Sequence, residues 1–173
     1  ASAAALVPLQ HAVAQTAAAK GDWFAMIQAH HLMIAKSFEQ LLASGNRTYL
    51  QRDRLIAAIG YQLTAHSVAE ENVIYPALAM GGMTAESDKL YLDQAHAKVM
   101  NAQLELAAKA NREGGAWMEP ARALQAAVLK HAKEDEEGRI YPQLKAKLSP
   151  EQNALLTAGY QREFASVQRK RGI

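Results

Sequence analysis

The sequence predicts an all-α protein: an antiparallel up-down-up-down four-helix bundle with an extra N-terminal helix and a C-terminal helix. Three observations support this fold class. Half of the 173 residues are hydrophobic but only 6% are aromatic, a composition typical of helical proteins. Apolar residues recur every three or four positions along four long stretches, which short glycine-containing segments separate. The second and fourth stretches end in the same motif, which indicates two related helical hairpins.

The predicted helices have local boundary signals. Gly21-Asp22 supplies a break and then an N-cap for the first long helix, and Gly81-Gly82 closes the second. Pro120 suits the first turn of the fourth, and Ser149 with Gln152 forms a predicted capping box for the last. The expected elements of a single domain over residues 1–173 are a lead helix at 3–19, long helices at about 22–43, 48–80, 84–111 and 120–148 (together the bundle core), and a C-terminal helix at 150–168.

Charge and composition exclude several classes of function. The net charge of +2 is too close to balance to indicate binding to nucleic acid or to an anionic membrane. No run of about 18 apolar residues is present, so we expect no membrane-spanning helix and a cytoplasmic location. The chain has no cysteine, so histidines and carboxylates are the side chains left to hold a metal ion.

One motif occurs twice, in the second and fourth long helices. The first copy runs from His66 to Pro76 and the second from His131 to Pro142. Both copies begin with a histidine and end in two glutamates, two free positions and Ile-Tyr-Pro. Side chains one turn apart project from the same face of a helix, about 6 Å apart. Two histidine–carboxylate pairs that face each other are suited to a pair of metal ions.

One histidine falls on the apolar stripe of each long helix. These four residues are His31, His66, His96 and His131. When the two halves of the chain are aligned so that His66 falls on His131, His31 falls on His96, and Ile27, Ile34 and Leu41 fall on Leu92, Val99 and Leu106. This alignment favours His31 over the adjacent His30. An alignment displaced by one further position instead places His30 on His96, so His30 remains the alternative.

The carboxylate of the fourth helix has two candidates. Asp135 lies four residues after His131, which is the spacing of Glu70 from His66, whereas Glu136 lies five residues after His131. Glu136 nevertheless keeps the downstream register, because the same pattern of apolar residues follows it as follows Glu70. We therefore favour Glu136, with a single-residue π-bulge after His131, because such bulges recur at functional sites. Asp135 remains the alternative.

Together these residues predict a di-metal centre inside the bundle. Four imidazoles and two carboxylates are donors that iron or manganese accepts, with the carboxylates bridging the ions and two histidines on each ion. The predicted ligands are His31, His66, Glu70, His96, His131 and Glu136. The expected apolar walls are Ile27, Ile34, Leu63, Val99, Met100 and Val128. Glu71, Glu137, Tyr75 and Tyr141 are candidates to support the ligands or to cap the end of the bundle.

The order of these ligands resembles the hemerythrin-like, HHE cation-binding family. The repeated EE-x-x-IYP endings are also similar to that family, and the likeness spans about residues 22–148. The resemblance implies an antiparallel four-helix bundle around two iron ions, bridged by an oxo or hydroxo group and by two carboxylates. It implies the same six ligands, and manganese and zinc are the alternative metals.

The resemblance also implies a function: the binding, sensing or storage of O₂ or a related small molecule. Oxygen-carrying hemerythrins have a second histidine one turn after the ligand of the third helix, where this chain has Met100. The missing imidazole would leave an open position, where metals react. A di-iron redox enzyme acting on O₂, peroxide or nitric oxide is therefore the alternative, and a metal-storage or structural bundle is a second one. The added terminal helices either cover the end of the bundle or form the surface of a homodimer.

Overall fold

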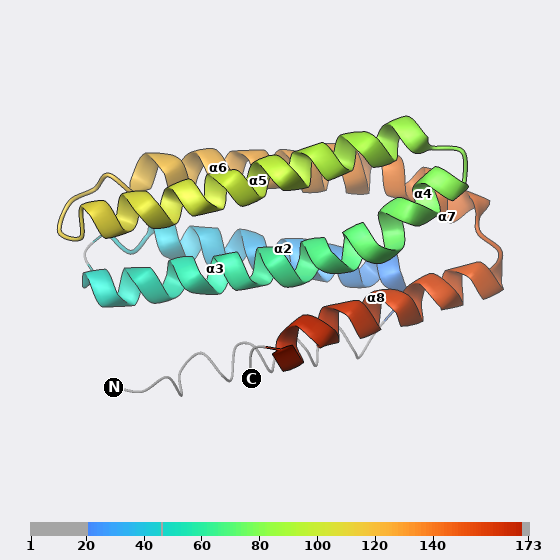
Figure 1. Ribbon diagram of the computed structural model, residues 1–173, viewed down its shortest axis with the longest axis horizontal. Helices are drawn as coiled ribbons and strands as arrows, with labels where there is room; N and C mark the ends of the chain where they lie inside the picture. Colours follow the sequence, from blue (N-terminus) through green and yellow to red (C-terminus); the bar gives the residue numbers. More distant parts are fainter. Residues whose placement is uncertain (1–20, 46, 171–173) are drawn as a thin grey trace.

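The computed structural model describes residues 21–45 and 47–170, and within these ranges all regular secondary structure is helical (Figure 1). The elements are α2 (Trp23–Leu42), α3 (Tyr49–Ala69), the π-helix η2 (Glu70–Ile74), α4 (Tyr75–Met80), α5 (Thr84–Ala110), α6 (Met118–Lys130), the π-helix η3 (His131–Ile140), α7 (Tyr141–Lys147) and α8 (Pro150–Lys170). The predicted all-α bundle with a C-terminal helix is therefore confirmed. The predicted lead helix at 3–19 lies outside the described residues.

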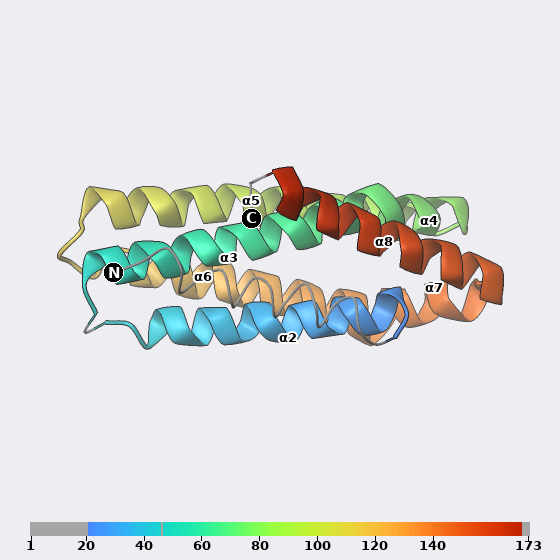
Figure 2. The same cartoon turned by 90° about the horizontal axis from the view of Figure 1, so that it is seen from below.

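Four antiparallel rods form the bundle. The rods α2 and α3–η2–α4 make one layer, and the rods α5 and α6–η3–α7 make the other (Figure 1). Direct contacts join α2 to α3 and α6, and join α5 to α3, α4 and α6. The last helix, α8, lies outside the bundle and runs diagonally across α2, α3 and η2, on the side away from α5 (Figure 2). In the described part of the chain, no helix combines the length and apolar character that crossing a membrane requires.

The predicted caps and breaks are present at the ends of the helices. The Asp22 carboxylate accepts a hydrogen bond of 3.2 Å from the backbone N–H of Ala25 at the start of α2. Gly82 follows α4 with a φ of +79°, a left-handed conformation that glycine adopts without steric cost. Before α8, the Ser149 N–H donates to Gln152 Oε1 at 2.8 Å and the Gln152 N–H donates to Ser149 Oγ at 3.2 Å. This pair is the predicted capping box.

Two hydrophobic clusters fill the bundle, and a polar section separates them. The cluster near α4, α7 and α8 includes Trp23, Ile27, Ile74, Tyr75, Leu78, Leu90, Ile140 and Tyr141. The cluster at the opposite end includes Ile34, Phe38, Leu41, Ile59, Leu104, Trp117, Leu124 and Val128. In each rod a polar residue falls between these two groups. These residues are His31, Gln94, His66 and His131.

Both copies of the repeated motif form π-helices, and their prolines explain why. Pro76 and Pro142 lack a backbone N–H, and their rings crowd the carbonyl group four residues earlier, so they disfavour a regular α-helix at this point of each rod. In the wider π register, the Tyr75 N–H instead reaches the Glu70 carbonyl and the Tyr141 N–H reaches the Glu136 carbonyl. The π-bulge predicted after His131 is therefore present, but it extends over ten residues.

The predicted inner face of α5 is wrong. Leu92, Val99 and Leu106 are 71%, 56% and 66% exposed, so the stripe on which His96 was placed faces outward, and Val99 is not a wall of the centre. The inner face consists of Leu90, Gln94, Leu104 and Ala108, which are buried. The apolar periodicity identified the wrong face of α5 because this helix carries apolar residues on both its inner and its outer face. The alignment that relates the inner faces of α2 and α5 is displaced by two positions from the predicted one, and it places Ile27 on Leu90 and His31 on Gln94.

Gly138 in η3 provides a test of the π register. In an ordinary helix, Gly→Ala stabilises by roughly 0.5–1 kcal/mol. A Cβ at Gly138 would lie 2.7 Å from the backbone carbonyl oxygen of Lys133, five residues earlier. We therefore expect Gly138→Ala to lower the free energy of unfolding by about 1 kcal/mol or more, measured in urea. The control Ala126→Gly in α6 should lose about 1 kcal/mol, as in any α-helix, and a Gly138→Ala variant that gains stability would contradict the π register.

Candidate metal centre

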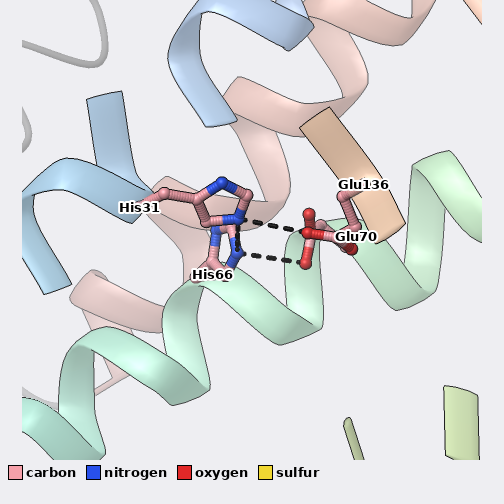
Figure 3. A group of neighbouring side chains, drawn as sticks. All are labelled: His31, His66, Glu70 and Glu136. Carbon is pink, nitrogen blue, oxygen red and sulfur yellow. Dashed lines mark hydrogen bonds and ion pairs between the residues drawn. The ribbon is translucent and has the colours of Figure 1, made fainter. Parts of the chain in front are cut away.

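Four buried side chains from three rods meet in the polar section (Figure 3). The Nε2 atoms of His31 (α2) and His66 (α3) lie 3.0 Å apart. His31 Nε2 is 3.1 Å from Glu136 Oε2, and His66 Nε2 is 3.2 Å from Glu70 Oε2. Glu70 and Glu136 have no exposed surface at all. The ligand atoms of these four residues lie within 4.8 Å of one another, which is close enough to hold a metal ion.

His131 adds a third imidazole to this group. Its Nε2 atom lies 3.1 Å from Glu136 Oε1, on the side of the carboxylate away from His31. The His131 side chain is 11% exposed, so it is the histidine of the centre that solvent reaches most easily. The centre thus contains three imidazoles and two carboxylates, all donor types that iron, manganese and zinc accept.

The outer nitrogen of each imidazole has a partner of its own. His31 Nδ1 lies 2.7 Å from Glu137 Oε1, His131 Nδ1 lies 3.2 Å from Asp93 Oδ2, and His66 Nδ1 lies 3.1 Å from the Tyr160 hydroxyl. A carboxylate on Nδ1 favours the tautomer that carries its proton there, which leaves Nε2 free to bind a metal. Metal-binding histidines are usually held in this way.

Tyrosines from the two copies of the motif link the carboxylates. The Tyr141 hydroxyl lies 2.7 Å from Glu70 Oε1 and 2.6 Å from Glu136 Oε1. The Tyr75 hydroxyl donates to Glu136 Oε1 at 3.0 Å and lies 3.5 Å from Glu70 Oε2. Each tyrosine therefore reaches the glutamate of the opposite rod. Burial, together with the nearby charges of Glu136 and Glu70, raises the pKa of both hydroxyls, so they keep their protons.

The protonation of the centre is uneven. Burial and then the charge of Glu136 raise the pKa of Glu70 well above its usual value. Burial also opposes ionisation of Glu136, but the imidazoles of His131 and His31 outweigh it and hold the Glu136 pKa well below its usual value. Burial and the charge of His31 lower the pKa of His66, which leaves a neutral imidazole of the kind that binds metals.

Two features of this geometry fit a cation. When both imidazoles carry only their outward Nδ1 protons, His31 and His66 present two lone pairs to each other at 3.0 Å, an arrangement that needs either a second proton on His31, whose pKa is raised, or a cation between them. Glu136 Oε2 is buried and accepts no hydrogen bond, although His31 Nε2 is only 3.1 Å away. A buried oxygen without a donor usually has a specific explanation, and a bound ion is one.

The structure brings five of the six predicted ligands together and leaves one outside. His31, His66, Glu70 and Glu136 form the cluster, and His131 adjoins it. His96 is exposed, and it lies at the edge of a cavity that leads to the centre. The expected arrangement of two histidines on each of two ions is therefore not formed by these side chains.

The two alternatives left open by the sequence lie outside the cluster. His30 is buried on the other side of α2, where its ring stacks on Phe164 at 4.1 Å and burial lowers its pKa to about 3. Asp135 pairs with Lys89 at 2.7 Å and with Arg139 at 3.0 Å near the surface. Of the two pairs of candidates, the structure therefore places His31 and not His30, and Glu136 and not Asp135, in the cluster.

Gln94 stands where the internal two-fold relationship would place a fourth histidine. Its Nε2 amide donates to Glu70 Oε2 at 2.9 Å and to the Tyr75 hydroxyl at 3.1 Å. This contact with Glu70 corresponds to the contact of His31 with Glu136. The alignment of the inner faces of α2 and α5 places His31 on Gln94. The apolar residues on either side of Gln94 were therefore the signal in the sequence that could have identified Gln94 as part of the centre.

Tyr160 of α8 is a second contributor that sequence reasoning missed. Its hydroxyl lies between His66 Nδ1 at 3.1 Å and His30 Nδ1 at 2.8 Å. When His66 binds a metal through Nε2, its proton is on Nδ1, and Tyr160 then accepts from the His66 N–H and donates its one proton to His30 Nδ1. The low pKa of His30 keeps its imidazole neutral and able to accept that proton. No spacing in the sequence links Tyr160 to His66, 94 residues away, because only the docking of α8 joins them.

A cavity of about 210 Å³ connects the centre with the surface between α5 and the α6–η3 rod. His31, His66 and His131 lie at its inner end. Its other lining residues are Leu63, Ala97, Ala127, Val128 and Ala132, with Lys89, Asp93, Gln94, His96, Lys130 and Asp135. Lys89 joins Asp93 at 2.6 Å and Asp135 at 2.7 Å, so an ion-pair group stands at the exposed side of the cavity.

Tyr160→Phe tests the contribution of α8. The variant leaves the His66 N–H buried without an acceptor, so we expect metal affinity to fall by roughly 10- to 100-fold, measured by competition with a chromogenic chelator. The control Tyr49→Phe, at the far end of the bundle, should bind metal like the unmodified protein. Equal affinities for both variants would mean that Tyr160 does not orient His66.

Comparison with known proteins gives one match. The hemerythrin HHE cation binding domain family matches residues 24–150. No curated protein and no solved structure matches the chain. The matched segment contains the five converging donors, whereas Tyr160 lies beyond it. With a buried histidine–glutamate cluster inside the matched helices, the chain belongs to the hemerythrin HHE cation-binding domain family.

Proposed function

We propose that this protein is a non-heme di-iron protein that binds O₂ or a related small molecule. The observation that carries the proposal is the convergence of three imidazoles on two buried carboxylates, with the outer nitrogen of every imidazole held by a partner. Nitrogen and carboxylate donors without thiolates suit iron. Bound iron would supply the redox chemistry that O₂ binding requires, whereas the protein supplies the donors, their orientation and the access route.

The arrangement supports two unequal ion positions. The Nε2 atoms of His31 and His66 would serve one ion, and His131 would serve the other, with Glu70 and Glu136 between them. The second position has one imidazole, and Gln94 and Tyr75 lie beside it. It therefore has fewer protein donors, which leaves room for an external ligand.

The size of the cavity supports a ligand of a few atoms. Its volume of about 210 Å³ is below the roughly 300 Å³ at which pockets begin to hold drug-sized molecules. Leu63, Ala97 and Val128 give it apolar walls near the histidines, which suits a small, weakly polar molecule. His131 stands at the inner end, and behind it the Tyr75 hydroxyl, which donates to Glu136 Oε1, lies 3.4 Å from His131 Nε2.

A redox enzyme acting on O₂, peroxide or nitric oxide is the second candidate. The observation that favours it is the presence of protonated Tyr75 and Tyr141 hydroxyls against both carboxylates. Reduction of oxygen species consumes protons, and these hydroxyls hold protons beside the metal ligands, with a raised pKa that keeps them protonated until charge develops next to them. Stopped-flow mixing of the reduced, iron-loaded protein with O₂ separates the two functions. A spectral change that reverses when O₂ is removed supports binding, whereas lasting oxidation with turnover of added reductant supports an enzyme.

Histidine variants test both the metal and its ligands. We expect about two iron ions per chain after iron-replete expression, measured by elemental analysis. His131→Ala removes the only imidazole near the second ion position and should reduce the iron content to about one ion per chain or less. His96→Ala is the matched control, and we expect its iron content to be unchanged because His96 is exposed and outside the cluster.

The opposite pattern would overturn this ligand assignment. Loss of iron in His96→Ala with retention in His131→Ala would return His96 to the ligand set. An unmodified protein that binds neither iron nor another metal would contradict the proposed function and metal storage, and would leave only a structural role for the bundle.

A further inference from the structure

The outer face of α5 carries an apolar stripe that nothing in the described chain covers. Leu92, Val99 and Leu106 account for three of the eight exposed large hydrophobic side chains of the described residues. They recur every seven residues along α5, a helix of 27 residues that lies on the side of the bundle away from α8 (Figure 1). Single exposed hydrophobic residues need no explanation, but a row of them indicates an interaction surface.

The stripe has the seven-residue repeat of a coiled coil. Its first positions are Ala85, Leu92, Val99 and Leu106, and its fourth positions are Asp88, Ala95, Ala102 and Lys109. All eight side chains are exposed. An average spacing of 3.5 residues keeps such a row facing a partner helix along its whole length. The inner face of α5 buries a different set of residues, so the bundle does not require this repeat.

We propose that a second copy of this chain docks on this face, with the two α5 helices antiparallel about a two-fold axis. In an antiparallel pair, first positions of one helix lie opposite fourth positions of the other. Leu92 would then lie opposite the partner's Ala102, and Val99 would lie opposite the partner's Ala95. Leu92 and Val99 each meet an alanine, so the middle parts of the two helices approach closely without a void, and Leu106 lies opposite the partner's Asp88 toward the ends.

Charge fixes the direction of the pair. Asp88 and Lys109 lie at opposite ends of the stripe. Asp88 has no ion-pair partner among the described residues, and Lys109 has only a contact of 3.8 Å with Glu105. In the antiparallel pair, Asp88 lies one turn from the partner's Lys109, twice by symmetry. A parallel pair would instead place Asp88 beside the partner's Asp88 and Lys109 beside the partner's Lys109.

The stripe alone makes an interface of modest size. A helix of this length extends about 40 Å, and a contact strip about 10 Å wide amounts to roughly 800 Å² over both partners. That area lies below standard specific interfaces, so we expect a reversible dimer with a dissociation constant in the micromolar range. The proposal is independent of the metal and of the proposed function, because none of the eight side chains belongs to the centre.

Sedimentation velocity of the full chain, from about 1 µM to about 500 µM, measures this equilibrium. We expect a monomer–dimer transition in this range, and Leu92→Glu should weaken it more than about tenfold. The matched control is Leu155→Glu, because Leu155 of α8 is also 71% exposed but lies elsewhere, and it should dimerise normally. Circular dichroism should give both variants the helical content and the thermal unfolding midpoint of the unmodified protein, which shows that they fold.

Charge reversal tests the direction. Asp88→Lys and Lys109→Asp should each weaken the dimer, and the double variant should restore it, because the antiparallel pair exchanges the two charges. A chain that stays monomeric at all concentrations would overturn the proposal, and so would a dimer that Leu92→Glu and Leu155→Glu affect equally. A dimer that the double variant does not restore would overturn the antiparallel arrangement.

Discussion

The structure depends on one constraint: two carboxylates, Glu70 and Glu136, lie with no exposed surface in the middle of a helical bundle. An ionised carboxylate is costly to bury unless other groups compensate its charge and fill its hydrogen-bonding positions. His31, His66 and His131 provide the compensating nitrogens, and two tyrosine hydroxyls provide the hydrogen bonds. The hydrophobic clusters on both sides keep the two carboxylates buried, so these few polar contacts are stronger than they would be in water.

The repeated motif solves this problem with a short segment of sequence. The proline disfavours a regular α-helix, and the π register that replaces it joins the glutamate carbonyl to the N–H of the tyrosine five residues later. The backbone of each copy thus holds its own glutamate and tyrosine together. The hydroxyls of Tyr75 and Tyr141 then reach the glutamate of the opposite rod. Two copies of one motif therefore bind to each other, and the centre forms where they meet.

Much of the fold and of the centre follows from local signals in the sequence. Glycine breaks, caps and apolar periodicity locate the rods, and the register after Glu136 identifies it over Asp135, because both are properties of neighbouring residues. The rotation of α5 does not follow, since Leu90 and Leu104 compete with Leu92 and Leu106 for the same role and only packing in three dimensions decides between them. The contribution of Tyr160 could not be predicted for a different reason. Its contact with His66 exists because α8 folds back across the bundle, and no pattern within either helix records that return.

The amide of Gln94 makes the two halves of an otherwise symmetric centre chemically different. An amide is neutral and donates a proton to Glu70, whereas the imidazole in the equivalent place offers a lone pair. Two metal ions held here would consequently differ in basicity of surroundings and in reduction potential, since both follow from the donors around each ion. The substitution of a single residue is therefore enough to make a duplicated scaffold chemically asymmetric at its centre.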